Sequence, residues 1–240
     1  MRPFLSADWR HLLMLNYAVD PDLLRPFVPR GTELDAWGGT CYVSVVGFLM
    51  RGTRVLGVPV PFHRDFEEVN LRFYVRRRAP EGWRRGVVFV QEIVPRRAIA
   101  AVARLRFNEP YRAMPMRHRI DATDGELRPN GTVAYEWRLR GRWHALRGTV
   151  TGSPQRPEAG SEHEFITEHH WGYTAQRDGG SLEYLVEHDP WRVWSVHDAL
   201  LDCDVSAVYG SRFAGPLQGP ARSAFVAEGS PVVVHRGVRI

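Results

Sequence analysis

The most unusual absence from this sequence is lysine. The chain has 240 residues and none of them is lysine, so all 32 members of the Lys/Arg class are arginine. Catalysis through an imine requires a side-chain primary amine, which only lysine supplies. Arginine stays protonated at any ordinary pH and does not form an imine. The sequence therefore excludes every mechanism that passes through a lysine Schiff base.

Cysteine and long apolar runs are scarce as well. Cys41 and Cys203 are the only cysteines and lie far apart, which predicts free thiols in a reducing cytoplasm. No run of about 18 apolar residues exists, so the chain predicts no membrane span. Asp8 interrupts the N-terminus before the apolar core of about 7–15 residues that a secretory signal needs. We therefore expect a cytoplasmic protein with no membrane partner.

The arginines are concentrated in the middle of the chain. Residues 72–147 contain 18 arginines against 7 acids. A basic segment can be a footprint for nucleic acid, because phosphate contacts dominate such binding. Here the arginine runs stand beside turn residues, where charges usually face water, and no zinc-finger or RNA-recognition motif accompanies them. We predict no nucleic-acid partner.

Glycine and proline divide the chain into short apolar segments that are typical of strands. Strands are predicted over residues 41–50, 69–76, 86–94, 133–140, 182–188 and 231–238. A short helix is predicted after Asp20, a favourable N-cap followed by Pro21, and a second helix over 97–107, whereas 152–160 is predicted to be a loop. We expect one mostly-β domain of the α+β class over residues 1–240.

The strand around residues 69–75 is the most informative segment. Because side chains alternate along a strand, one face carries only apolar residues: Val69, Leu71, Phe73 and Val75. The other face carries the polar set Glu68, Asn70, Arg72 and Tyr74. Two interpretations remain open. The polar face is either the wet side of an amphipathic strand or, in a barrel, the wall of a ligand cavity.

Common catalytic signatures are missing. The sequence has no Gly-x-Ser-x-Gly, no phosphate-binding loop and no Gly-x-Gly-x-x-Gly after a strand. Histidines and acids gather between His163 and Asp189, but adjacent His169 and His170 would point to opposite faces of a strand. Metal sites require three or four converging ligands. We predict neither a metal nor a cofactor.

Several short motifs resemble a known family. They are Phe66-x-Glu68-x-Asn70-x-Arg72, Tyr17-Ala18-Val19-Asp20-Pro21, Pro29-x-Gly31, Ala103-Arg104, Pro110-Tyr111, Phe165-Ile166-Thr167-Glu168 and His188-x-Pro190-Trp191. In order and spacing the chain resembles the YqjF-like conserved proteins, a family of unknown function in the acetoacetate decarboxylase-like superfamily. The resemblance implies a cone or incomplete antiparallel barrel with flanking helices, and self-association.

The resemblance also locates a pocket with altered chemistry. In acetoacetate decarboxylase the reactive lysine directly follows a proline, and another cation stands beside it. The matching residues here are Pro110, Tyr111 and Arg112, so Tyr111 replaces the nucleophile. Glu68 matches the superfamily's active-site glutamate, with Glu67 as the alternative. The family usually has Arg-Tyr after Thr167-Glu168, where this chain has His169-His170.

Two functional hypotheses follow. The first is a binding protein for a small molecule, expected to be a carboxylate, that keeps the pocket without the lysine chemistry. The second is a lyase or dehydratase that acts on an oxo-acid, with Glu68 and Tyr111 transferring protons. In both, Asn70, Arg72 and Arg104 would bind the ligand, and two arginines beside one glutamate would attract anions. The eight tryptophans, a residue enriched at interfaces, also predict a homodimer.

Overall fold

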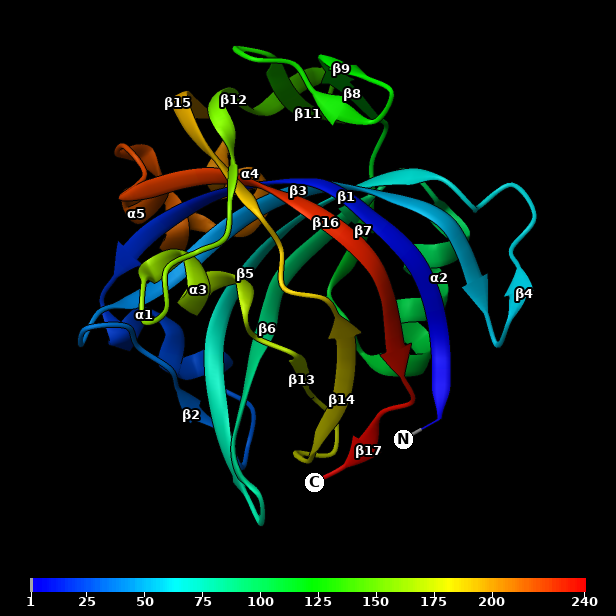
Figure 1. The fold of residues 1–240 in the computed structure, drawn as a ribbon. Helices are drawn as coiled ribbons and strands as arrows, with labels where there is room; N and C mark the ends of the chain where they lie inside the picture. The colour runs from blue at the N-terminus through cyan, green and yellow to red at the C-terminus, as the bar shows by residue number, and fades with distance from the viewer. Residues whose placement is uncertain (1) are drawn as a thin grey trace.

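The computed structural model describes residues 2–240 and consists mainly of long, curved strands (Figure 1). The strands are β1 (Pro3–Val19), β2 (Glu33–Leu34), β3 (Cys41–Val55), β4 (Val58–Pro59), β5 (Phe66–Ala79), β6 (Gly82–Val94), β7 (Tyr111–Ala113), β8 (Met116–Ile120), β9 (Ala122–Thr123), β10 (Glu126–Leu127), β11 (Thr132–Leu139), β12 (Arg142–Gln155), β13 (Trp171–Ala175), β14 (Ser181–His188), β15 (Val193–Asp202), β16 (Ser223–His235) and β17 (Val238–Arg239). The helices are α1 (Pro21–Leu24), α2 (Arg97–Phe107), α3 (Glu162–Thr167), α4 (Val205–Tyr209) and α5 (Ala214–Gln218). The mostly-β prediction is confirmed.

Seven of the strands pair in a closed ring. Their order is β14, β13, β6, β5, β3, β1 and β16, and β14 returns to β16 with Val186 opposite Val234. Every pair in the ring is antiparallel except β13 with β6. A sheet that pairs back on itself forms a barrel and leaves no open edge within the ring. The barrel is thus closed, and it is mixed rather than purely antiparallel.

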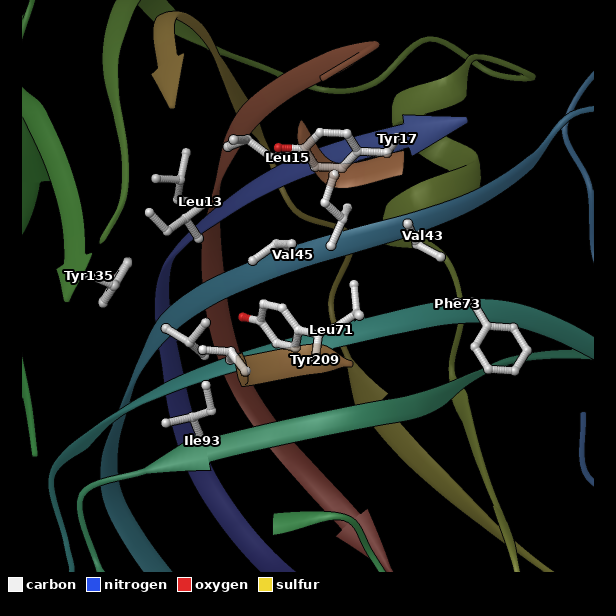
Figure 2. Packing of buried hydrophobic residues seen from close by; sticks show 14 of the residues in the cluster. Leu13, Leu15, Tyr17, Val43, Val45, Leu71, Phe73, Ile93, Tyr135 and Tyr209 are labelled. Atoms are coloured by element: carbon white, nitrogen blue, oxygen red, sulfur yellow. The ribbon is translucent and has the colours of Figure 1, made fainter. Parts of the chain in front are cut away.

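A second layer covers the outside of β1, β3 and β5. β16 pairs with β15 as well as with the ring, and β15, β12, β11 and β8 continue the sheet over the barrel. Figure 2 shows apolar side chains that fill the space between the layers, among them Leu13, Leu15, Val43, Val45 and Leu71. Gly47 permits this contact, because a Cβ there would lie 2.6 Å from Tyr135 Cδ2.

Helix α3 packs against the inner face of the sheet. Its Phe165 and Ile166 are buried with Tyr42 and Tyr74 in a second apolar cluster on the inner side. Glu162 at the start of the helix accepts a hydrogen bond from Tyr42 Oη at 3.0 Å. The helix is therefore attached to the inner face of the sheet by both apolar packing and hydrogen bonding.

Both predicted helices are confirmed, and the first has the predicted cap, with Asp20 accepting from the Asp22 N–H at 2.8 Å. The loop prediction for 152–160 is wrong over its first part, because β12 continues to Gln155 and pairs with Val193. Strand β1 was not predicted. Much of its length is buried, because it lies between the second layer and the barrel interior, so alternation of apolar and polar residues is weak.

Candidate functional site

The barrel interior contains a cavity of about 380 Å³. Small-molecule sites commonly have about 300–1,000 Å³. Most of the lining is apolar, and it includes the aromatic side chains Trp9, Phe48, Phe66, Phe89, Trp171 and Trp191. Helix α2 and residues 53–63 line another part of the wall. Histidines and other polar side chains are spread around the wall, but the glutamates and the arginine of the lining lie on or next to β5, β6 and β7.

Strand β5 presents its polar face to this cavity. Glu68, Asn70 and Arg72 all line it, with exposed fractions of 4%, 2% and 8%. Asn70 Nδ2 donates to Glu68 Oε1 at 3.3 Å, and Arg72 Nη2 donates to the Ile166 carbonyl of α3 at 3.3 Å. Tyr74 is also buried, but its hydroxyl contacts Ser44 Oγ at 2.6 Å, away from the cavity lining. The cavity interpretation of this strand is therefore favoured over a wet surface.

Strand β6 adds a second carboxyl group through an irregularity. Its pairing with β5 shifts by one residue around Val90. Phe89, before the shift, and Glu92, after it, both line the cavity although they are three residues apart. Regular alternation would put residues three apart on opposite faces. The bulge therefore turns Glu92 inward, as bulges beside functional sites often do.

Strand β7 brings in Tyr111. It runs parallel to β6, and Tyr111 is the register partner of Glu92. The Tyr111 hydroxyl donates to Glu68 Oε2 at 3.3 Å. Glu109, two residues earlier, lines the cavity as well and accepts hydrogen bonds from Thr174 and from Tyr184, the latter at 3.2 Å. Three buried glutamates and one tyrosine thus share a corner of the cavity.

Burial shifts the titration of this cluster. Burial raises the pKa of Glu68 to about 7, although hydrogen bonds from Asn70 and Tyr111 oppose the shift. It likewise raises the pKa of Glu109 to about 7. The pKa of Glu92 lies well above its usual value because burial and the charges of Glu109 and Glu68 disfavour the ionised form. We therefore expect Glu92 to be neutral, and the cluster as a whole to hold protons near neutral pH.

Three polar atoms on the wall formed by β5 and β6 have no hydrogen-bond partner within residues 2–240. They are Asn70 Oδ1, Arg72 Nε and Glu92 Oε2, and we call them the open atoms. A buried polar group without a partner costs about 1–3 kcal/mol, and native proteins contain few of them. Other lining residues also have an atom without a partner: Trp9 Nε1, Thr53 Oγ1, His169 Nδ1 and His235 Nδ1. The open atoms differ in that they lie at neighbouring positions of two paired strands, which indicates where the polar end of a ligand or a water would bind.

The structure separates Arg104 from the other predicted site residues. Glu68, Asn70, Arg72 and Tyr111 line the cavity, but Arg104 is exposed on α2 and does not. Its neighbour Ala103 faces the cavity. Consecutive helical residues are about 100° apart around the axis, so Arg104 points away. The prediction that Arg104 reaches into the pocket is wrong for this geometric reason.

The structure also shows which of Glu67 and Glu68 faces the cavity, and where Arg112 lies. Glu67 is not on the cavity; it accepts from His118 Nδ1 at 2.6 Å on the other side of the strand, so Glu68 is the inward glutamate. Arg112, which replaces the cationic neighbour of the superfamily's lysine, donates to the Ala207 and Val208 carbonyls of α4 at 3.3 and 3.2 Å. Arg112 thus caps a helix and does not face Tyr111's cluster.

The adjacent histidines have different environments. His169 lines the cavity, and its Nε2 lies 3.1 Å from Asp35 Oδ2. Burial lowers the pKa of His169 to about 4 although Asp35 opposes the shift, so we expect a neutral ring. His170 contacts Glu168 at 3.0 Å, and its ring lies on that of His188 with centroids 4.4 Å apart.

Glu92 and Glu109 were not predicted as site residues from the sequence. The available signal for Glu92 was one acid inside the apolar segment 86–94, and for Glu109 its position before Pro110 and Tyr111. Neither signal reveals that the two carboxyls meet. No group of three or more His, Cys, Asp or Glu side chains in residues 2–240 is arranged to hold a metal ion. Over the same residues, no helix has the length and apolar character to cross a membrane.

Solved structures with the same fold are acetoacetate decarboxylase-like enzymes. Acetoacetate decarboxylase from Legionella pneumophila superposes with a TM-score of 0.68 at 13% identity, over 100% of this chain and 88% of that one. The enduracididine biosynthesis enzyme MppR, in complex with pyruvate, gives a TM-score of 0.70 at 16% identity, over 100% and 91%. At such identities the likeness establishes the fold, and the predicted acetoacetate decarboxylase-like fold is confirmed.

Sequence comparison identifies nearer relatives. The uncharacterized protein YqjF of Bacillus subtilis (strain 168) is 29% identical over 192 residues, which cover 78% of this chain and 74% of YqjF. The family model DUF2071, described as an uncharacterized conserved protein, matches residues 6–231. This chain therefore belongs to the DUF2071 family, as the resemblance to YqjF-like proteins predicted.

Proposed function

We propose that this protein binds a small, mostly apolar molecule inside the barrel, with the polar end of that molecule at Glu68, Asn70, Arg72 and Tyr111. The observation that carries the proposal is the cavity of about 380 Å³, whose apolar lining surrounds a wall with open polar atoms. An apolar pocket with a few convergent polar groups and shifted pKa values is the usual form of a small-molecule site.

The proposed ligand differs in charge from the one that the sequence predicted. That prediction placed two arginines beside one glutamate. Arg72 is the one arginine among the lining residues of the described chain, and it shares the cavity with Glu68, Glu92 and Glu109. The premise of two arginines beside one glutamate is therefore not met, and any of these glutamates that ionises would repel a carboxylate.

Tryptophan fluorescence tests the binding proposal, because Trp9, Trp171 and Trp191 line the cavity. Titration with six-carbon alcohols, amides and acids should give a saturable change with at least one of them. Val46 lines the cavity on β3 directly beside Asn70, its register partner on β5, so Val46→Trp should fill the space and remove the response. Leu200→Trp, at a position that is 41% exposed, is the matched control and should keep it. A wild-type protein that responds to none of these compounds would refute the proposal.

A second candidate function is a lyase or dehydratase that acts on an oxo-acid. The observation in its favour is the Glu68 pKa of about 7, because a general acid or base works best near the ambient pH. Glu68 would remove a proton beside the carbonyl, and Tyr111 would donate a hydrogen bond. Deuterium exchange at that carbon, followed by NMR, tests it. Exchange should disappear in Glu68→Gln and persist in Arg104→Gln; equal exchange in both variants would count against the enzyme.

Neither candidate uses an imine. MppR has been described with pyruvate bound, which supports the idea that this fold can admit a small oxo-acid. With no lysine in the chain, incubation with pyruvate and borohydride should add no mass to any internal peptide. An adduct mapped by mass spectrometry to an internal side chain would contradict this expectation.

We also propose that the protein is a homodimer. Large exposed apolar side chains support this, and they cluster on α2 and around β4: Leu56, Val58, Phe62, Val102 and Leu105. Exposed apolar patches commonly mark interaction sites. Light scattering should report twice the chain mass of 27.5 kDa, and a constant 27.5 kDa at all concentrations would refute the dimer.

A further inference from the structure

The open atoms restrict which polar group the ligand can carry. Asn70 and Glu92 are direct register partners on β5 and β6, and Arg72 is two residues along the same face of β5. Side chains of direct cross-strand partners have Cβ atoms about 4.5–5.5 Å apart, and residues two apart on a strand are separated by about 7 Å. The three open atoms thus belong to neighbouring positions, within reach of one small polar group.

Two of the open atoms are hydrogen-bond acceptors. Asn70 uses its Nδ2 to donate to Glu68 Oε1, and this orients the amide with Oδ1 left as an acceptor. Glu92 lies beside the carboxyl group of Glu109 and the hydroxyl of Tyr111, and burial with the neighbouring charges raises its pKa and keeps it neutral. A proton directed toward Glu109 leaves Oε2, which has no partner, as an acceptor. The third open atom, Arg72 Nε, is a donor.

A carboxylate does not fit this set. It has acceptor oxygens only, so it could pair with Arg72 Nε but would bring its charge toward the oxygens of Asn70 and Glu92. An ammonium group fails in the opposite way, because it has donors only and would add a positive charge beside the Arg72 guanidinium. The set requires a group that has donors and an acceptor and carries no charge.

We propose that the polar end of the ligand is a neutral group with N–H donors beside a carbonyl, of the type found in a primary carboxamide. Its two N–H groups donate to Asn70 Oδ1 and Glu92 Oε2, and its carbonyl oxygen accepts from Arg72 Nε. The remainder of the ligand is apolar and lies along the aromatic lining of the barrel. This inference rests on the proposed binding function and specifies the ligand class for the same site.

A matched set of probes tests the inference on the wild-type protein. Hexanamide, hexanoate and hexylammonium share one carbon chain and differ in the polar end. Isothermal titration calorimetry at about pH 7.5 should give hexanamide at least a tenfold lower Kd than either charged probe. Hexanoate or hexylammonium binding as tightly as hexanamide would overturn the inference while leaving the binding function intact. Absence of binding by all three, and by hexanol, would overturn the binding function and the inference together.

Variants locate the interaction. Asn70→Leu removes one open acceptor at similar volume and should raise the Kd for hexanamide about tenfold, with the Kd for hexanol unchanged. Thr149→Val is the control, because Thr149 is half-buried on β12 in the second layer and does not line the cavity. Hexanamide should bind this control with wild-type affinity. Melting temperatures establish that both variants are folded, and an equal loss in both would overturn the assignment to Asn70.

Discussion

The two faces of strand β5 are buried to almost the same extent, yet they differ in what surrounds them. Val69, Leu71, Phe73 and Val75 on the outer face are each 0% exposed and contact the apolar layer between the sheets. Glu68, Asn70 and Arg72 on the inner face are at most 8% exposed but border a cavity. Burial alone therefore does not distinguish a packed core from a binding site. Along β5, the two faces are distinguished by the unfilled space and by the polar atoms without partners on the inner face.

The largest expected difference between the faces is in stability. Leu71→Ala on the outer face should lower the free energy of unfolding by about 2–5 kcal/mol, because it leaves a hole in a close-packed layer. Asn70→Leu, one residue away on the inner face, should change it by less than about 1 kcal/mol, since removal of an unpaired oxygen beside existing space offsets the loss of the hydrogen bond to Glu68. Urea denaturation measures both. Similar losses in the two variants would mean that the inner face is as rigidly packed as the outer one.

A smaller difference concerns pH. Burial raises the pKa of Glu68 from 4.5 to about 7, so the folded state binds this proton more tightly than the unfolded state. The stabilising contribution is complete below about pH 4.5 and is lost as the pH rises through about 7. Glu68→Gln has no such titration. The difference in unfolding free energy between wild type and variant should fall by about 2–4 kcal/mol across this window.

Glu67→Gln is the matched control for the pH experiment, because Glu67 is adjacent but lies outside the cavity. The hydrogen bond with His118 lowers the pKa of Glu67, so its contribution is present at neutral pH and is lost as the pH falls. The two difference curves should therefore have opposite slopes. Histidines with lowered pKa values, such as His11 and His169, titrate in all three proteins and cancel in the differences.

The smallest expected effect is at Arg104. Because this side chain is exposed on α2, Arg104→Ala should change the free energy of unfolding by less than about 0.5 kcal/mol. The Kd for any cavity ligand should also stay at the wild-type value. Arg72→Leu provides the comparison and should weaken ligands that have an acceptor. A ligand response that depends on Arg104 would show that this side chain reaches the site in solution.

Much of the fold was predictable wherever the two sides of an element differ. Strand β5 could be recognised because one face is uniformly apolar, and α2 because its residues follow a helical stripe. Strand β1 was missed because both of its sides meet protein. The ring closure through β14 and β16 joins Val186 to Val234 and depends on the curvature of the whole barrel, which local sequence does not encode.

Part of the site could be predicted because the two faces of strand β5 differ. Glu68, Asn70 and Arg72 share one strand, so alternation alone places them together. Tyr111 was reached only through the family resemblance. Glu92 was not predicted because the bulge at Val90 breaks the alternation on which such predictions rely. Arg104 was predicted on the wrong side of its helix.

Because of the bulge in β6, the composition of the site depends on the number of residues in this strand. Val90 is the extra residue that keeps Glu92 facing the interior and Ile93 facing the layer between the sheets. Deleting Val90 would restore regular alternation, so every later residue of the strand would exchange sides and the carboxyl group of Glu92 would point into the apolar layer. Deletion of this single residue, without any substitution elsewhere, would therefore disrupt both the site and the apolar core.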